Sequence, residues 1–200
     1  MRRRTFDILM ATAGLFLAIT LIASGVLLTW AHTFIGNEVH TQLATQQIFF
    51  PAANSKAVAA PEFAAMRQYG GQQLTTGAQA EVYADHFIAN HLKAIGGGKT
   101  YAQLSTEAQL QPKNTVLAGE VATVFKGETL RGLLLNAYAF GTMGTIAGIA
   151  AIGAFIAAAV MLVLSGLGLM HARRVAPEAE ILNGHPANGR TPVPASSSAS

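Results

Sequence analysis

The chain contains no cysteine and few charged residues. Without cysteine no disulfide can cross-link the protein and no thiolate can bind a metal, so any folded region depends on packing. Charged side chains make up 12% of the residues, against roughly 25% in an average soluble domain, whereas hydrophobic residues make up 51%. This composition is typical of a small membrane protein.

Two long hydrophobic segments, residues 8–30 and 133–170, contain no charged side chain. As a helix, residues 8–30 would span about 35 Å, enough to cross a hydrocarbon core of about 30 Å. Residues 133–170 would span about 57 Å, which is nearly twice that thickness. We therefore expect the second helix to cross from about residue 147 onward, with residues 133–146 outside the bilayer. The uncharged segments argue against an ion channel.

Arginines flank each segment on one side only. Lys and Arg collect on the cytoplasmic side of membrane spans, and aromatic side chains mark the interface. The expected topology anchors are Arg2, Arg3, Arg4, Trp30, Arg173 and Arg174. We expect a protein of the plasma membrane with both termini cytoplasmic and the centre outside. A cleaved signal peptide is the alternative interpretation of the first segment, but its apolar run exceeds the 7 to 15 residues of that class.

The formal charge of +3 belongs to the ends of the chain. Residues 31–131 hold seven Lys or Arg and seven Asp or Glu, so their sum is zero. The basic pI of about 9.5 thus reflects topology and not a surface for polyanions. We expect the lipid bilayer as a partner, and no nucleic acid.

The predicted fold is an all-α membrane protein. Its two transmembrane helices extend as a long antiparallel hairpin, with a small helical extracytoplasmic domain between them. The expected boundaries are a cytoplasmic N-terminus (1–7), transmembrane helix 1 (8–30), the outer domain (31–132), the long second helix (133–170) and a disordered cytoplasmic tail (171–200). The second helix is expected to begin near Asn114, because residues 133–146 overhang the membrane.

Small residues on both segments are candidates for close helix packing. Gly144 and Gly148 have the small-x-x-x-small spacing, and Gly141 lies one turn earlier. Gly14 with Ala18 offers a matching groove on the first segment. The spacing fits packing within the chain and also contact in a homo-oligomer.

The outer region contains one well-marked amphipathic helix. Thr76 and Gln79 have the spacing of a capping box, an apolar stripe follows, and residues 96–98 (GGG) end it. Residues 51–71 are predicted to be irregular, because they contain two prolines and two glycines. A short second helix is predicted over residues 101–110, before Pro112.

These outer residues also carry a resemblance. Residues 78–82 (AQAEV), His91, residues 97–102 (GGKTYA) and Leu130 with Arg131 resemble a family of two-span envelope proteins from high-GC Gram-positive bacteria. That family is functionally unassigned, and some members carry a label as aromatic ring-opening dioxygenases that their residues do not support. The resemblance implies the same two-span topology; residues 42–71 depart from the family pattern.

The motifs of the outer region give no catalytic or cofactor site. His86 and His91 lie five residues apart, about 140° around a regular helix, whereas a metal pair on one helix uses a spacing of three or four. Residues 96–100 (GGGKT) follow a helix and lack the first glycine of a phosphate-binding loop. We expect no metal and no cofactor.

Two classes of function remain. The favoured one is a non-enzymatic integral membrane protein of the cell envelope, a scaffold or accessory subunit that contacts another membrane protein or a second copy. The alternative is a ligand-binding or enzymatic outer domain, including the family's dioxygenase label. Its pocket would lie between the capped helix and the long pair, and the candidate lining residues are Tyr83, His86, Phe87, His91 and Tyr101.

Overall fold

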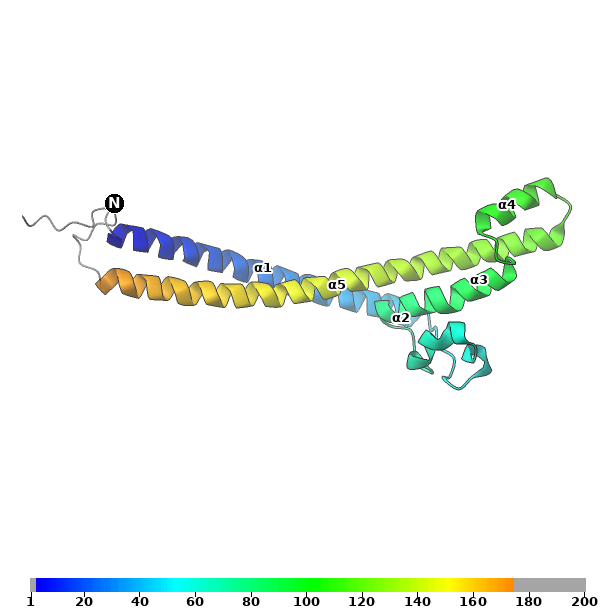
Figure 1. Ribbon diagram of the computed structural model, residues 1–200, viewed down its shortest axis with the longest axis horizontal. Coiled ribbons are helices and arrows are strands. Elements are labelled where there is room, and N and C mark those ends of the chain that lie inside the picture. The colour runs from blue at the N-terminus through cyan, green and yellow to red at the C-terminus, as the bar shows by residue number, and fades with distance from the viewer. Residues whose placement is uncertain (1–2, 175–200) are drawn as a thin grey trace, which may run out of the picture. The chain divides into compact units, whose positions relative to one another are not determined.

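A computed structural model describes residues 3–174 of the chain. Within this range helices are the only regular secondary structure, apart from one isolated bridge between Phe49 and Gln73. The helices are α1 (Arg3–Thr45), η1 (Lys56–Val58), η2 (Pro61–Tyr69), α2 (Gly77–Val82), η3 (Tyr83–Ile88), α3 (Ala89–Ile95), α4 (Tyr101–Leu110) and α5 (Thr115–Arg174) (Figure 1). The all-helical class predicted from the sequence is confirmed.

The two longest helices, α1 and α5, are long and apolar enough to cross a membrane. Their most apolar windows are largely exposed, because only 17% of the residues in the α1 window and 11% in the α5 window are buried. The core helix of a soluble protein would instead bury most of such a window. Residues 3–174 therefore leave much of the apolar surface of both helices exposed, and something other than these residues must bury it.

Helix α5 is unbroken from Thr115 to Arg174, which confirms the predicted continuity through residues 133–146. Its start is fixed by Asn114, whose Oδ1 accepts a hydrogen bond from the Leu117 N–H at 3.1 Å. Its end corrects one boundary, since residues 171–174, which were expected in a disordered tail, form the last helical turn. The other predicted tail residues, and Arg2, lie outside the described residues.

The chain packs as two units, of which one combines residues 3–23 with residues 154–174. In this unit Gly14 of α1 lies beside the side chain of Ser165, and a Cβ added to Gly168 would lie 3.4 Å from the Cβ of Ala11. The buried residues of the unit are all small: Ala11, Ala18, Ala154, Ala158, Ser165 and Ala172. Small side chains allow helix backbones to approach closely, which is how helices associate in a membrane.

The other unit, residues 24–153, contains the larger apolar core. In it, the helical run α2, η3 and α3 packs antiparallel on α5. At one end a Cβ on Gly77 would lie only 3.0 Å from the Ala137 carbonyl oxygen, and at the other Leu92 contacts Gly127. Absence of a side chain at Gly77 and Gly127 thus lets the two helical elements lie close together.

The run from Gly77 to Ile95 corresponds to the predicted amphipathic helix. Thr76 and Gln79 form the predicted capping box, since each side chain accepts a hydrogen bond from the backbone N–H of the other. One feature was not predicted: η3 is a π-helical segment in the middle of the run. Such segments add a residue to one turn and rotate the side chains that follow. The 140° angle expected between His86 and His91 assumed a regular helix and does not apply across η3.

The prediction of an irregular segment over residues 51–71 is wrong in part, because it contains η1 and η2. Pro61 is the first residue of η2, a position where proline costs no hydrogen bond. The Arg67 guanidinium joins the two helices by donating to the carbonyls of Val58 and Ala59 at 2.9 and 2.7 Å. Val58 and Met66 are fully buried as a result.

Helix α4, at the bounds predicted for it, packs on the first turns of α5 (Figure 1). A capping box of Thr100 and Gln103 starts this helix. Its buried Leu104 forms a small core with Leu117 and Val124 of α5. This core is separate from the larger cluster of the same unit.

Candidate functional site

Three of the five predicted pocket residues form a row of rings along η3 and α3. The ring centroids of Tyr83 and Phe87 are 4.8 Å apart, and those of Phe87 and His91 are 4.3 Å apart. Phe50 and Phe63 cover the row from residues 49–71, with centroids 5.4 Å from Tyr83 and 5.7 Å from His91. Tyr83 and Phe87 therefore pack against the apolar core, whereas His91, at the end of the row, is exposed.

The other two predicted residues lie apart from this row. His86 contacts η2, where its Nδ1–H donates to the Glu62 carbonyl at 3.2 Å. Tyr101 is on α4 and packs against Phe125 of α5, with centroids 5.5 Å apart. A shallow hollow near His91 is lined also by Glu62, Phe63, Asn90, Lys93, Ala94, Gly97 and Gly98. His91 is the one predicted pocket residue that lines it.

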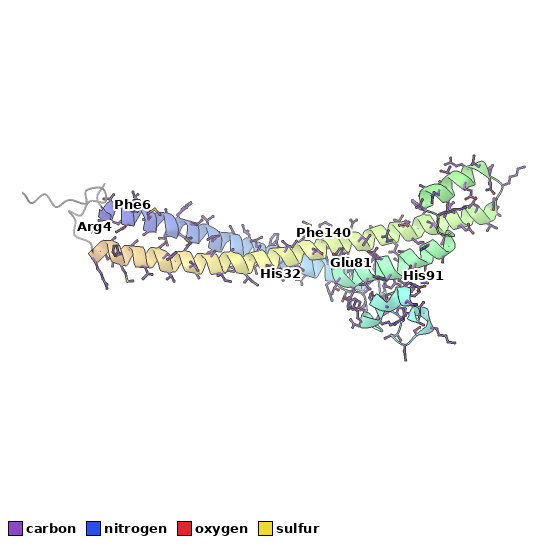
Figure 2. All side chains as sticks on the ribbon, in the orientation of Figure 1. Arg4, Phe6, His32, Glu81, His91 and Phe140 are labelled. Atoms are coloured by element: carbon purple, nitrogen blue, oxygen red, sulfur yellow. The ribbon has the colours of Figure 1, made fainter. Side chains whose placement is uncertain are left out.

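The polar groups of this region are engaged in structural contacts. The Nδ1–H of His91 donates to the Phe87 carbonyl at 2.7 Å, one turn earlier in the same run (His91 and Glu81 are labelled in Figure 2). Burial raises the pKa of the Tyr83 hydroxyl, which keeps it protonated at neutral pH. In residues 3–174 no three His, Asp or Glu side chains are placed to hold a metal ion.

An ion pair that the sequence did not suggest links the capped run to α5. Arg131 binds Asp85 at 2.8 Å and Glu128 at 3.5 Å. The hydrogen bond that Arg131 donates to Asp85 raises the pKa of the Arg131 guanidinium above its ordinary value. The two residues are 46 positions apart, so their pairing gives no local signal in the sequence.

The predicted packing glycines of α5 have three different neighbours. Gly141 lies against Gly77, with the added Cβ 3.3 Å from the Gly77 Cα. A Cβ on Gly144 would lie 3.0 Å from Ile35 Cγ2, and one on Gly148 would lie 2.9 Å from His32 Nδ1. His32 also donates its Nδ1–H to the Gly144 carbonyl at 2.8 Å. The neighbour of Gly14 is Ser165, so the expected match between the two small-residue pairs is not what the contacts show.

The predicted topology anchors that the structure describes all lie on α1 or α5. Arg4 lies at the start of α1 (Figure 2), and Arg173 and Arg174 end α5. Trp30 is 65% exposed and stacks on Phe34 with centroids 5.5 Å apart.

An apolar groove with a volume of about 510 Å³ lies between α1 and α5. Buried Leu43 and Leu134 belong to its floor, and exposed Phe34, Leu133 and Phe140 form its edges (Phe140 is labelled in Figure 2). The remaining lining residues are Ile35, Glu38, Val39, Gln42, Gln46, Ile48, Leu130, Asn136, Ala137 and Met143.

Sequence reasoning missed this groove. The walls are about a hundred residues apart in the chain, so only the pairing of α1 with α5 brings them together. Glu38 and Gln42 are hydrogen-bonded to each other at 2.5 Å on one edge. Gln46 and Asn136 are the other two polar lining residues, and the rest of the lining is apolar.

Comparison with known proteins does not assign the chain to a family. No family model, no curated protein and no solved structure matches the chain.

Proposed function

We propose that this chain is an integral membrane protein of the cell envelope, a non-enzymatic scaffold or accessory subunit. The observation that carries the proposal is the exposed apolar surface of α1 and α5, of whose most apolar windows only 17% and 11% of residues are buried. Water would oppose so much exposed apolar surface on two helices long enough to span a bilayer. A bilayer covers this surface without requiring further protein.

In the proposed topology both termini are cytoplasmic and residues 31–132 lie outside. It rests on the one-sided arginines at residues 2–4 and at Arg173 and Arg174. An antiparallel hairpin of α1 and α5 fits the contacts inside each unit. Gly14 meets Ser165 in one, and His32 and Ile35 meet Gly148 and Gly144 in the other. The same topology would be shared with the two-span envelope family that the sequence resembles.

A scaffold role is favoured over catalysis because the candidate chemical groups do not converge. Within residues 3–174 no three His, Asp or Glu side chains are placed to hold a metal ion, and Arg131 is paired with two carboxylates. A non-haem iron dioxygenase needs two His and a carboxylate that converge. Ligand binding is the second candidate, and the observation in its favour is the apolar groove.

Cysteine labelling tests the membrane placement, because the natural chain has no cysteine to interfere. Lys113→Cys lies in the proposed outer region and Ser197→Cys in the proposed cytoplasmic tail. In intact cells a membrane-impermeant maleimide is expected to label Lys113→Cys and to label Ser197→Cys only after lysis. Equal labelling of both before lysis would contradict the topology.

Co-purification tests the scaffold role. The full chain is extracted in a mild detergent, purified and analysed by mass spectrometry for bound proteins. We expect a protein partner in a fixed ratio, either a different membrane protein or a second copy. A monomer that retains a small molecule and no protein would support the ligand-binding alternative.

A further inference from the structure

The groove between α1 and α5 lies next to the proposed membrane surface. Trp30 has the position of an interfacial aromatic, and Phe34, the first groove residue on α1, stacks on it with centroids 5.5 Å apart. Four residues of helix correspond to about 6 Å. The groove therefore opens about one helical turn beyond the interface.

An exposed apolar surface leads from the spans to the groove without interruption. On α1 it consists of Leu27, Trp30 and Phe34, which are three and four residues apart and so share one face. On α5 the exposed residues Phe140, Met143 and Ile146 are three residues apart. An apolar chain could pass from the bilayer into the groove and keep apolar contact throughout.

The dimensions of the groove fit one hydrocarbon chain. Its α5 wall, from Leu130 to Met143, is about 20 Å long at 1.5 Å per residue. A hydrocarbon core of about 30 Å holds two layers of acyl chains, so a single chain spans about 15 Å. The groove offers about 510 Å³, which is within the range of small-molecule sites.

The polarity of the lining favours the same occupant. The floor is formed by buried Leu43 and Leu134, and it belongs to the apolar core of residues 24–153. Eleven of the fifteen lining residues are apolar; the four polar ones are Glu38, Gln42, Gln46 and Asn136, of which Glu38 and Gln42 are hydrogen-bonded to each other at the edge. A ligand held here needs apolar surface and no specific polar group.

From these observations we infer that the groove binds one acyl chain of a phospholipid from the outer leaflet. This inference rests on the proposed membrane topology, which places the groove just outside the bilayer. The bound chain shields the apolar edges Leu133, Phe140 and Met143 from water, and it gives the scaffold a direct contact with lipid beyond its two spans.

The test uses the full chain in lipid nanodiscs doped with a phosphatidylcholine that carries a diazirine at the end of one acyl chain. After irradiation the labelled peptides are mapped by mass spectrometry. Lipids that merely surround the spans place their chain ends at the bilayer midplane, about 15 Å from either surface. A chain in the groove places its end at residues 34–48 or 130–143, where surrounding lipid does not reach. We expect labels in those two segments.

A pair of glutamate variants makes the result specific. Leu133 is 61% exposed and lines the groove, whereas Val116 is 73% exposed on the same helix and does not line it. Leu133→Glu is expected to reduce groove labelling by at least about tenfold, because it replaces an apolar lining residue with a second carboxylate besides Glu38. Val116→Glu is expected to leave the labelling unchanged.

Two results would overturn the inference. One is labelling confined to the midplane in the natural chain. The other is a disulfide that joins two copies through Leu133→Cys while the groove takes no lipid label, which would assign the groove to a second copy. Extraction with alkaline carbonate separates this failure from that of the proposed function. A chain released by carbonate contradicts the membrane placement, whereas a retained but unlabelled chain contradicts the lipid site alone.

Discussion

At the scale of single residues, the buried hydroxyl of Tyr83 makes the stability of the protein depend on pH in the alkaline range. Burial raises the pKa of its hydroxyl above the ordinary value of 10.0. Between that value and the higher folded-state pKa, the unfolded chain loses the Tyr83 proton and the folded chain keeps it. The contribution of Tyr83 to the free energy of unfolding is therefore constant below pH 10 and decreases as the pH rises above 10.

The substitution Tyr83→Phe removes this ionisation. At pH 7 the two proteins are expected to differ by no more than about 1 kcal/mol, because both carry an uncharged ring. From pH 9 to pH 11 the unfolding midpoint of the natural protein should fall further than that of Tyr83→Phe. Thermal unfolding in one detergent across this pH range measures the difference. Parallel curves for the two proteins would show that Tyr83 titrates normally in the folded state.

At the scale of elements, glycines decide where the helices meet. Gly77 and Gly127 mark the contact of the capped run with α5, and Gly144 and Gly148 mark the contact of α1 with α5. The sequence identified the second pair from its spacing, since small-x-x-x-small predicts close packing. Gly77 and Gly127 have no partner at that spacing, so their role follows only from the fold. The π-helical segment η3 was likewise invisible, because the apolar stripe it interrupts keeps its general pattern.

The substitution Gly144→Leu tests the contact between α1 and α5. Its Cβ would lie 3.0 Å from Ile35 Cγ2 and 3.3 Å from Ile35 Cβ, so the helices must separate. We expect a loss of about 1–3 kcal/mol, typical of overpacking, measured as a lower unfolding midpoint in detergent. Gly153→Leu is the matched control, because nothing lies within 4 Å of its added Cβ. Both substitutions change helix propensity by the same amount. Equal unfolding midpoints of the two variants would therefore contradict the contact between Gly144 and Ile35.

At the scale of the whole molecule, residues beyond the C-terminal boundary of the predicted outer domain complete the core of that domain. Leu134 is buried in the main apolar cluster, and Leu135 and Ala137 pack against it. All three lie beyond residue 132, the end of the outer domain expected from the sequence. Without cysteine, no disulfide replaces these contacts.

A fragment of residues 31–132 is therefore expected to be aggregated or only partly folded. A fragment of residues 24–153, which contains the complete cluster, is expected to unfold cooperatively in a mild detergent. Size-exclusion chromatography and thermal unfolding distinguish the two. A monomeric 31–132 fragment with a cooperative transition would contradict the assignment of this core.

Sequence patterns alone predict the all-helical class, the two long apolar helices, the continuity of α5 through residues 133–146 and the helix cap at Thr76. These features depend on composition, on helical periodicity and on contacts between residues a few positions apart, all of which can be read locally. Three features are evident only in the tertiary structure: the burial of Val58 and Met66, the pairing of Arg131 with Asp85, and the groove between α1 and α5. Each of these joins residues from different elements, and local patterns carry no information about which elements meet.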